Sequence, residues 1–466
     1  MLTYNFTNIG SDFLYEYLYK CIKNDILQGR IRVGEKLPSK RSFAKNLGVS
    51  VMTVENAYEQ LVAEGFIYAM PKRGFYVSSF KKSSAREKSS LPTAMISTID
   101  GQSDFFADFT SNQTPSDLFP FTIWSKTVRE VLADSRIQLM TNPPCGGILA
   151  LRQAIANYLK DFRGMSVAPE QIIIGAGTEY LYGLLIQLLG RDKKYGVENP
   201  GYLKIAQIYQ AHGVSCDWVG MDEKGISVDT LEEKGIDIIH CSPSHHFPTG
   251  IVTPISRRYE LLGWASRKAG RYIIEDDYDS ELRLSGKPIP TMQSIDVSER
   301  IIYMNTFTKT LSSTVRISYM VLPPDLLHTF MKELSFYSCT VSNFEQYTLA
   351  RFIEEGKFEA HINRLRNHYR KKRQYFLRAI EESALGQRVE ITGEDAGLHF
   401  LMQVHSTRTM EELIAGLKGE GVNLAPLADY DATGSDAFRH YYVMNDASLS
   451  EEAIPACIDL LEKWCK

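Results

Sequence analysis

A lysine in a segment of small hydroxylated residues is the first candidate for covalent chemistry in this chain. Lys309 lies in TFTKTLSS (306–313), which overlaps the end of RIIYMNTF (300–307), an apolar run typical of a buried strand. A partly desolvated amine beside a cationic ring has a lowered pKa and is a competent nucleophile. Arg316 follows seven residues later and is suited to a bidentate contact with a phosphate. A lysine in a Ser/Thr-rich loop is also a common surface feature, so the interpretation depends on its partners.

Carboxylates follow a second apolar run, RYIIEDD (271–277). Asp276 lies at the end of that run, and a carboxylate at a buried strand end is unfavourable unless it is paired. A pyridinium nitrogen would be such a partner, and Tyr278 would then reach the oxygen on the same ring. A solvated acidic turn and a metal site are the alternatives. The pair His245 and His246 lies in a Pro-bounded loop without metal-ligand spacing, so no metal site is predicted.

Small residues between the run QIIIGAG (171–177) and a predicted helix indicate an anion site. Ala176, Gly177 and Thr178 let backbone N–H groups face an anion at the helix N-terminus. Tyr202, in ENPGY, is a candidate stacking platform for a ring. An amine, a carboxylate, a phosphate cradle and a ring platform are what pyridoxal 5′-phosphate (PLP) requires of a protein. The four features together predict PLP as the cofactor.

A different pattern occupies residues 37–77, LPSKRSFAKNLGVSVMTVENAYEQLVAEGFIYAMPKRGFYV. Ser39 and Ser50 are suited to cap two short helices, and FIYAM, PKRG and FYV predict a two-stranded wing with a basic tip. A helix-turn-helix of this kind places its second helix in the DNA major groove. The candidate DNA contacts lie at the start of the first helix (Ser39, Lys40, Arg41), on the outward face of the second (Ser50, Met52, Thr53, Asn56) and at the wing tip (Lys72, Arg73). A small helical domain with a charged surface is the alternative.

The elements that must position the PLP residues begin near residue 105, where helical stretches alternate with short apolar runs. Two further apolar runs, at 236–243 and 316–323, bring the total to five. Continuous β-branched runs separated by helices predict an α/β fold with a mostly parallel sheet, and ligands of such sheets gather beyond the carboxyl ends of the strands. The Ser-rich, charged segment KKSSAREKSSLP (81–92) predicts a linker before this region. A long helix-prone segment (344–386) leads to a C-terminal α+β portion.

Composition limits what both regions can be. The chain of 466 residues is too long for one hydrophobic core, so two or three domains are expected. Residues 1–82 contain 12 Lys and Arg against 7 Asp and Glu, although the whole chain has a net charge of −4, which favours a nucleic-acid contact confined to the N-terminus. Seven dispersed cysteines argue for reduced thiols and against zinc. No apolar run of 18 residues and no signal pattern occurs, so a cytoplasmic protein without membrane contact is predicted.

The N-terminal motif closely resembles the GntR family of winged helix-turn-helix repressors and activators, over roughly residues 10–78. Many GntR members carry Arg directly after the V-S pair as a base reader, whereas this chain has Val51 there. Base specificity would then rest on other residues or on apolar contact with a thymine methyl.

The order GAGT, ENPGY, SPSHHFPTG, EDDYDSE, TFTK and Arg316 resembles that of fold-type I PLP enzymes, the aminotransferase superfamily. EDDYDSE and SHHFPTG look like the MocR subfamily of GntR regulators, which fuse a winged domain to an aminotransferase-like domain. The roles that the resemblance implies are a PLP Schiff base on Lys309, Asp276 at the pyridine nitrogen, Tyr278 at the ring hydroxyl, Ala176, Gly177 and Arg316 at the phosphate, and Tyr202 stacked on the ring.

Two positions depart from the aminotransferase pattern. The asparagine that supports the ring oxygen is replaced by Phe247, with His246 beside it as a candidate substitute. This change argues against efficient transamination and not against cofactor binding. Lys204 stands where one subgroup has an effector-binding arginine, so a point charge replaces a planar fork and the effector need not be the same. Arg439, in AFRHYYVMN, resembles the arginine that binds the substrate carboxylate, with a plain surface role as the alternative.

These observations predict a PLP-dependent transcriptional regulator that binds operator DNA as a homodimer. Its domains would be a winged helix-turn-helix at 1–80, a linker at 81–104 and an aminotransferase-like effector domain at 105–466, with a large part at about 130–335 and a small C-terminal part at about 336–466. The effector would be an amino compound that exchanges onto the aldimine at Lys309, or PLP itself. The alternative function is an aminotransferase with an accessory N-terminal domain. A half-reaction is compatible with the intact lysine, and steady turnover is not expected.

Overall fold

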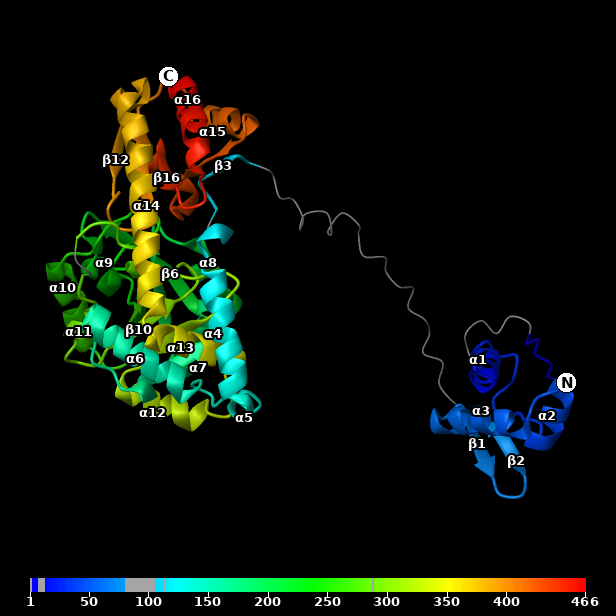
Figure 1. The fold of residues 1–466 in the computed structure, drawn as a ribbon. Coiled ribbons are helices and arrows are strands. Elements are labelled where there is room, and N and C mark those ends of the chain that lie inside the picture. Colours follow the sequence, from blue (N-terminus) through cyan, green and yellow to red (C-terminus); the bar gives the residue numbers. More distant parts are fainter. Residues whose placement is uncertain (1, 7–12, 80–104, 112–113, 287–288) are drawn as a thin grey trace. The chain divides into compact units, whose positions relative to one another are not determined.

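The computed structural model describes residues 2–6, 13–79, 105–111, 114–286 and 289–466. The chain divides into two compact units, Met1–Gln102 and Ser103–Lys466 (Figure 1). Each unit has a hydrophobic core of its own. The predicted linker at 81–104 lies outside the described residues.

The N-terminal unit combines helices with a small antiparallel sheet. Its elements are α1 (Leu14–Leu27), α2 (Lys40–Leu47), α3 (Val51–Ala63), β1 (Ile67–Met70) and β2 (Gly74–Val77). The Ser39 side chain caps α2 by accepting a hydrogen bond from the Ser42 N–H, and Ser50 caps α3 by accepting one from Thr53. Gly48, between the two helices, takes the left-handed conformation (φ 68°) that reverses the chain. The predicted winged helix-turn-helix is therefore present.

Helix α3 turns one face into the core of this unit. This face is fully buried and consists of Val54, Ala57, Tyr58 and Leu61. The Tyr58 hydroxyl donates a hydrogen bond to the Pro38 carbonyl, which fixes the chain where it enters α2. The opposite face begins with Val51 and Met52, and both side chains are exposed.

The C-terminal unit is built on an eight-stranded sheet with the order β4-β11-β10-β9-β8-β5-β6-β7. The strands are β4 (Ile172–Gly175), β5 (Lys194–Asn199), β6 (Ser215–Asp222), β7 (Gly225–Ile226), β8 (Ile238–Cys241), β9 (Tyr272–Asp276), β10 (Ile301–Thr306) and β11 (Ser318–Val321). The five strands from β10 to β6 in this order are parallel, while β11 is antiparallel to both of its neighbours and β7 is antiparallel to β6. The predicted mostly parallel sheet is confirmed.

Helices cover both faces of this sheet. Ile172 and Ile174 of β4 pack in a cluster with α6 (Leu149–Arg163) and α13 (Asn343–Glu354), whereas Ile173 packs with α7 (Thr178–Leu189), α8 (Leu203–Ala211) and α12 (Pro324–Glu333). Alternate residues of a strand point to opposite faces, so the central strands must be apolar along their whole length. The remaining helices of this part are α4 (Phe121–Asp134), α5 (Arg136–Leu139), α9 (Val228–Glu233), α10 (Ile255–Ser266) and α11 (Met292–Ile295).

The parallel strands bring the polar candidates to one edge of the sheet. β4 ends immediately before Ala176, β9 ends with Asp276, and β10 ends three residues before Lys309. Because these strands share a direction, their carboxyl ends meet at the same edge. The sheet therefore assembles residues that are far apart in sequence.

Three strands of the sheet, β5, β6 and the two-residue strand β7, were not among the predicted apolar runs. β5 carries Lys194, Gly196 and Glu198, and most side chains of β6 are only half-buried or exposed. Polar residues interrupt the apolar pattern because β6 lies near the edge of the sheet, next to the short strand β7. β11 was predicted as a strand, and its antiparallel direction is set by the short connection from β10.

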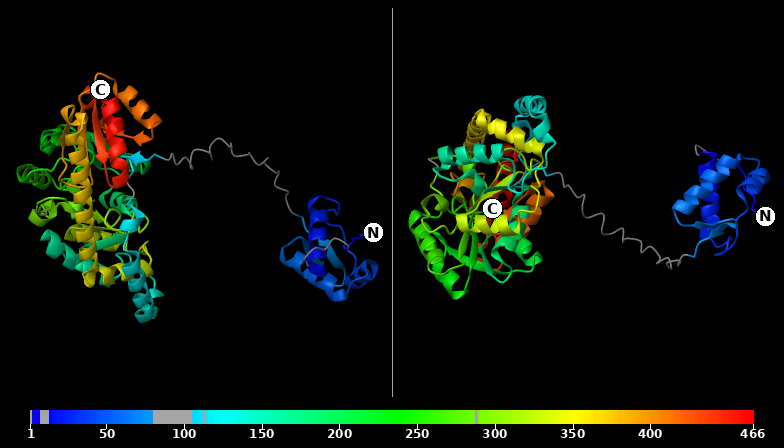
Figure 2. Two further views of the ribbon diagram at one scale, coloured as in Figure 1. Left: turned by 45° about the horizontal axis from the view of Figure 1, so that its top comes forward. Right: turned by 90° about the horizontal axis from the view of Figure 1, so that it is seen from below.

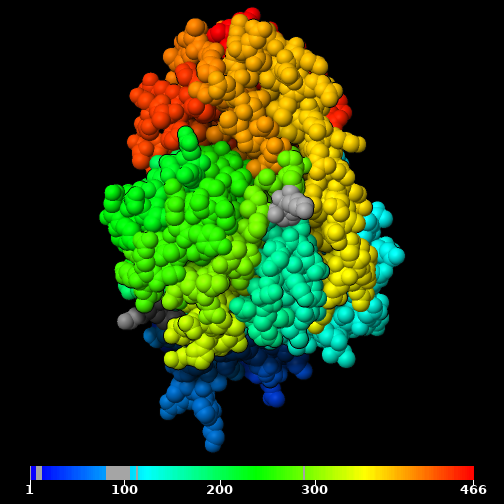
Figure 3. All heavy atoms as spheres, turned by 90° about the vertical axis from the view of Figure 1, so that its left-hand side faces the viewer, coloured from blue at the N-terminus to red at the C-terminus, as the bar shows by residue number. Residues whose placement is uncertain are grey.

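A second, antiparallel sheet forms the C-terminal part of this unit. Its strands, in order, are β12 (Val389–Thr392), β13 (His399–Val404), β16 (Tyr441–Asn445) and β15 (Ala425–Pro426), and it is accompanied by α15 (Met410–Gly419) and α16 (Ile454–Trp464). The short strand β3 (Ala107–Asp108) pairs with β14 (Val422–Asn423), which ties the start of the unit to this part. The orange and red elements of this part, together with the cyan strand β3, gather at one end of the unit (Figures 1 and 2). The long helix α14 (Lys357–Glu382) runs along both parts, as its yellow surface in Figure 3 shows.

Within the described ranges, no helix combines the length and the hydropathy that crossing a bilayer requires. All seven cysteines are free thiols, and Cys241, Cys339, Cys457 and Cys465 are buried.

Val51 and Val54 form a matched pair for testing the orientation of α3. Val51→Arg is expected to change the free energy of unfolding by less than about 0.5 kcal/mol, because Val51 is 43% exposed. Val54→Arg would bury an unpaired charge at a site that is 0% exposed, so it is expected to unfold the N-terminal unit. Scanning calorimetry of the full chain should show loss of that unit's transition only for Val54→Arg. Equal destabilisation by the two variants would contradict the placement of α3.

Candidate functional site

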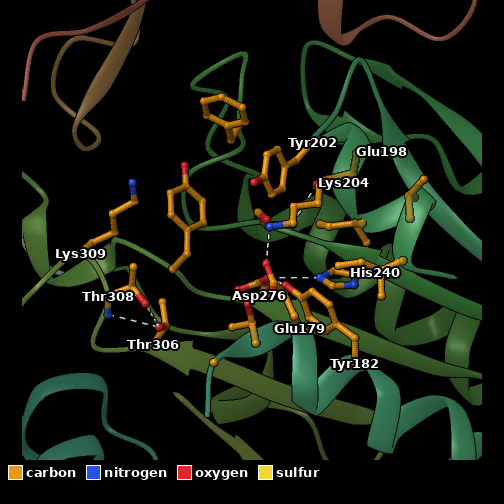
Figure 4. Close-up of a pocket in the computed structure, with 18 of the residues that line it drawn as sticks. Glu179, Tyr182, Glu198, Tyr202, Lys204, His240, Asp276, Thr306, Thr308 and Lys309 are labelled. Atoms are coloured by element: carbon orange, nitrogen blue, oxygen red, sulfur yellow. Dashed lines mark hydrogen bonds and ion pairs between the residues drawn. The ribbon is translucent and has the colours of Figure 1, made fainter. Parts of the chain in front are cut away.

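A cavity of about 360 Å³ lies at the carboxyl edge of the large sheet (Figure 4). Its walls come from residues in or just after β4, β5, β8, β9 and β10. The predicted site residues that line it are Gly177, Thr178, Tyr202, Lys204, Asp276, Tyr278, Lys309 and Arg316. The volume is in the range that small-molecule sites occupy.

Asp276 presents one open carboxylate oxygen in this cavity. The residue is 6% exposed, and its Oδ2 accepts hydrogen bonds from the Tyr182 hydroxyl (2.7 Å) and His240 Nε2 (3.2 Å). His240 Nδ1 lies 2.7 Å from the Tyr209 hydroxyl, so a phenol that donates there leaves the ring proton on Nε2, facing Asp276. Oδ1 has no hydrogen-bond partner among the described residues. A buried carboxylate oxygen of this kind requires a cationic or N–H partner.

Lys309 enters the same cavity from the loop after β10, on the side opposite Asp276 and His240 (Figure 4). Burial lowers the pKa of its amine to about 8, and the negative charge of Asp279 opposes this shift. The hydroxyl oxygens of Thr306 and Thr308 lie 2.7 Å apart, and the Thr308 N–H donates to Thr306 Oγ1, which holds the turn that presents the lysine. The amine is therefore positioned and tuned as a nucleophile at near-neutral pH.

Gly177 and Arg316 form a tight cradle at the N-terminus of α7. Gly177 has φ 92°, a backbone conformation that favours glycine, and a Cβ atom there would lie 2.5 Å from Arg316 Nη2, so the guanidinium would have to shift. The guanidinium and the helix N-terminus both favour an anion. Arg316 Nη2 lies 3.3 Å from Glu179 Oε2, and the Lys204 ammonium pairs with the other oxygen of the same carboxylate. These contacts, the one from Lys204 first, lower the pKa of Glu179.

Tyr202 and Phe247 stand at the wall of the cavity. Tyr202 is partly exposed and its ring packs edge-on against Phe247, with centroids 5.9 Å apart. Tyr202 lines the cavity and is 43% exposed, so its ring is accessible from the site, as a stacking platform needs. Phe247 also packs against Tyr430, so the residue in the place of the aminotransferase asparagine is part of an aromatic cluster.

Three predicted site residues do not line the cavity. Ala176 instead donates its N–H to Thr340 Oγ1 (3.0 Å). His246 is buried behind the cavity, where burial lowers its pKa to about 3, and its Nδ1 lies 2.6 Å from Thr249 Oγ1. Arg439 is mostly exposed and pairs with Asp436.

Four ionisable residues of the cavity escaped the sequence analysis, namely Glu179, Tyr182, Glu198 and His240. Tyr182 lies four residues after Thr178 in α7, so helical spacing could have placed it on the face of the anion site. His240 is an ionisable residue inside the buried strand β8, which is itself a signal of a polar partner. Burial raises the pKa of Glu198 to about 8, and its carboxyl group accepts a hydrogen bond from the Ser242 N–H.

Seven of the nine predicted DNA contacts are exposed on the surface of the N-terminal unit, and Thr53 and Lys40 are half-buried. The exposed residues are Ser39, Arg41, Ser50, Met52, Asn56, Lys72 and Arg73. The Lys40 ammonium is instead bonded to Glu55 Oε1 at 2.6 Å and lies over the Phe75 ring. Arg41 is therefore the cation that the start of α2 presents to solvent. Lys72 has φ 61° at the tip of the wing.

Comparison with known proteins identifies both units. Residues 14–77 match the family described as "Bacterial regulatory proteins, gntR family", and residues 106–451 match "Aminotransferase class I and II". The chain is 38% identical over 415 residues to the uncharacterized HTH-type transcriptional regulator YdeL of Bacillus subtilis, with 89% of each chain covered. It is 30% identical to the probable rhizopine catabolism regulatory protein MocR of Rhizobium meliloti, over 89% of this chain and 86% of the relative.

A solved structure shows the same fold in the second unit. Kynurenine aminotransferase from Pyrococcus horikoshii aligns with a TM-score of 0.68 and 23% identity, over 83% of this chain and 96% of the enzyme. Three findings therefore lead to the same assignment: the winged unit, the aminotransferase fold, and the similarity to transcriptional regulators over 89% of this chain. The chain belongs to the GntR family of transcriptional regulators, in the MocR-type subfamily that joins a winged helix-turn-helix to an aminotransferase class I and II domain.

Proposed function

We propose that the regulator carries PLP on Lys309 and that an amino compound bound at this site, or PLP itself, controls how the winged unit engages DNA. The observation that carries the proposal is one cavity holding a buried carboxylate with an open oxygen, Asp276, and an amine with a lowered pKa, Lys309. The structurally similar kynurenine aminotransferase was solved in complex with PMP. That likeness supports the fold, and the residues of this chain support the cofactor.

The residues present fit PLP at its ring nitrogen and at its phosphate. Asp276 Oδ1 would accept from the pyridine nitrogen, while Tyr182 and His240 hold the other oxygen in place. Gly177 and Arg316 would receive the phosphate in exchange for Glu179. When bound, PLP supplies an aldehyde that reacts with amines and a ring that withdraws electrons.

Effector binding would act through side chains that already contact one another. Lys204 and Arg316 share the Glu179 carboxylate, so an anion that displaces Glu179 also frees the Lys204 ammonium. We propose that Lys204 then binds the carboxylate or sulfonate of an amino compound whose amine competes with Lys309. A change in these contacts would shift the unit between two states with different affinities for DNA. Arg439 would join the effector site only after a movement of the C-terminal part, because its side chain is mostly exposed.

Exposed apolar side chains support a homodimer of the C-terminal unit. Ile137, Met140, Phe336 and Phe121 are among its most exposed large hydrophobic residues, and they lie in or beside α4, α5 and α12. Burial of such a surface is favourable, and a second copy of the chain is the proposed partner. Two winged units would then face two half-sites of an operator.

Removal of the proposed attachment point should abolish the covalent complex. Lys309→Ala is expected to show no visible absorbance after incubation with PLP, because no other lysine is predicted to bind the aldehyde in this cavity. Lys332→Ala, at an exposed site of α12 outside the cavity, is the control and should become yellow like the unchanged protein. An undiminished visible band in Lys309→Ala would show that a different lysine is used.

The rate at which the apoprotein becomes yellow after addition of PLP should depend on pH. Only the unprotonated amine attacks, and the pKa of Lys309 is lowered to about 8, so the rate should increase up to about pH 8 and then level off. An ordinary exposed lysine would instead give a rate that still rises near about pH 10. Stopped-flow absorbance over this range distinguishes the two results.

DNA binding tests the regulatory part of the proposal. Gel shifts with the DNA upstream of the gene, with and without PLP, should show binding by the full chain and a change in affinity between the two states. Arg41→Ala should weaken binding to all sequences and reduce the slope of log affinity against log salt by about one, because a phosphate contact is lost. Lys332→Ala again serves as the control. Absence of binding in both cofactor states would contradict the proposal.

A further inference from the structure

A buried cluster of imidazole and carboxyl groups lies behind the proposed cofactor site and has no role so far. His245 and His399 are each 2% exposed, and Asp279 is 1% exposed. They come from three segments: the loop after β8, the loop after β9 and the first residue of β13. The cluster therefore joins the large part of the unit to the C-terminal part, and it touches Tyr278, which lines the cavity.

The geometry favours a hydrogen-bonded pair over a metal site, although the three side chains are close enough to share an ion. His245 Nδ1 lies 2.7 Å from Asp279 Oδ2, so the contact already engages both groups. The rings of His245 and His399 are stacked, with centroids 4.2 Å apart and an angle of 27° between planes. The lone pairs of stacked rings do not converge on one point, as the ligands of a tetrahedral metal must.

The Asp279 carboxylate determines which nitrogen of His245 carries the proton. A hydrogen on Nδ1 makes a charge-assisted hydrogen bond, whereas a lone pair there would face the carboxylate and be repelled. The Tyr278 hydroxyl lies 3.4 Å from the same Nδ1. The N–H can therefore make a bifurcated hydrogen bond, in which the phenol oxygen is the weaker of the two acceptors. The phenol's own proton must then point away from His245.

We propose that the Asp279–His245 pair orients the Tyr278 hydroxyl as a hydrogen-bond donor into the cavity, and that the C-terminal part controls this pair through Gly397 and His399. The inference rests on the proposed function, because the acceptor would be the ring oxygen of PLP. Asp279 and His245 are positioning residues, since they act on the ring oxygen only through Tyr278. The donor would stabilise negative charge on that oxygen.

The C-terminal part is held tightly against the pair. A Cβ atom on Gly397 would lie 2.3 Å from His245 Nδ1 and 2.4 Å from Asp279 Oδ2, so only glycine leaves the pair intact. Arg373 of α14 donates to the Gly397 carbonyl (3.2 Å) and forms a two-pronged ion pair with Asp446, at 2.8 Å for each contact. A movement of this part would therefore displace the pair and release the phenol.

Other charged groups around Tyr278 and the Asp279–His245 pair also act on the titration of these side chains. Carboxylates that act on the phenol are Asp279, Asp276, Glu198 and Asp277, and groups that act on the His399 ring are His245, Arg373 and His246. Lys309 also feels the charge of Asp279. Because Asp279 acts on both the lysine and the phenol, substitutions of His245 and Gly397 test the orienting role more cleanly than substitutions of Asp279.

A double-substitution cycle on the PLP-loaded full chain tests this role. The readout is the pH at which the visible absorbance band of the PLP imine has changed by half. Tyr278→Phe should raise this midpoint by about one pH unit, because loss of one hydrogen bond to the charged ring oxygen disfavours the deprotonated imine. His245→Leu should raise it by a similar amount, and the double variant should add no further shift. His245→Asn keeps a donor near the place of Nδ1 and should restore most of the original midpoint.

Gly397→Ala provides an independent test if His245→Leu does not fold. It should also raise the midpoint, whereas Gly419→Ala, a glycine of the same part with open space around its Cβ position, should not. Additive shifts in the double variant, or an unchanged midpoint in both His245→Leu and Gly397→Ala, would overturn the orienting role. One equivalent of zinc in the purified apoprotein that disappears in His245→Leu would overturn it as well. A wild-type protein that never becomes yellow would instead defeat the proposed function.

Discussion

Desolvation at the carboxyl edge of the large sheet is the constraint on which the candidate site depends. The carboxylate of Asp276 lies at the buried end of β9, so it needs the hydroxyl of Tyr182 and the imidazole of His240 to remain in place. The same burial lowers the pKa of the Lys309 amine to about 8. One physical cause therefore produces both an acceptor for a cationic ring and a nucleophilic amine.

The anion cradle, formed by Gly177 and Arg316, differs from the buried residues Asp276 and Lys309 because its charged groups are open to solvent. Arg316 and Lys204 are about half-exposed and share the carboxylate of Glu179. Water screens these ion pairs, so each contributes little to stability and can be exchanged for another anion at small cost. The part of the site that must be rigid is thus buried, and the part that must exchange partners is exposed.

The C-terminal part connects to this site through a few close contacts. Gly397 approaches His245 and Asp279 so closely that no side chain fits between them, and Arg373 anchors the same segment to α14. Helix α14 extends along both parts of the unit, which makes it the mechanical link between them (Figure 3). Because no space is left at this contact, a movement of the segment around Gly397 must also move His245 and Asp279.

The sequence by itself determined the two units and the capped helices at Ser39 and Ser50, and it predicted three residues that line the cavity, Lys309, Asp276 and Gly177, because each follows from local spacing, strand ends or turn chemistry. It did not predict β5 and β6, where polar residues interrupt the apolar pattern, or β7, which has only two residues. Only the tertiary structure decided that Tyr182, His240 and Glu198 share the cavity, that Lys40 is occupied by Glu55, and that Arg439 lies outside. Those relations join segments far apart in the chain, and the packing of parallel strands and of α14 brings them together, which no local pattern encodes.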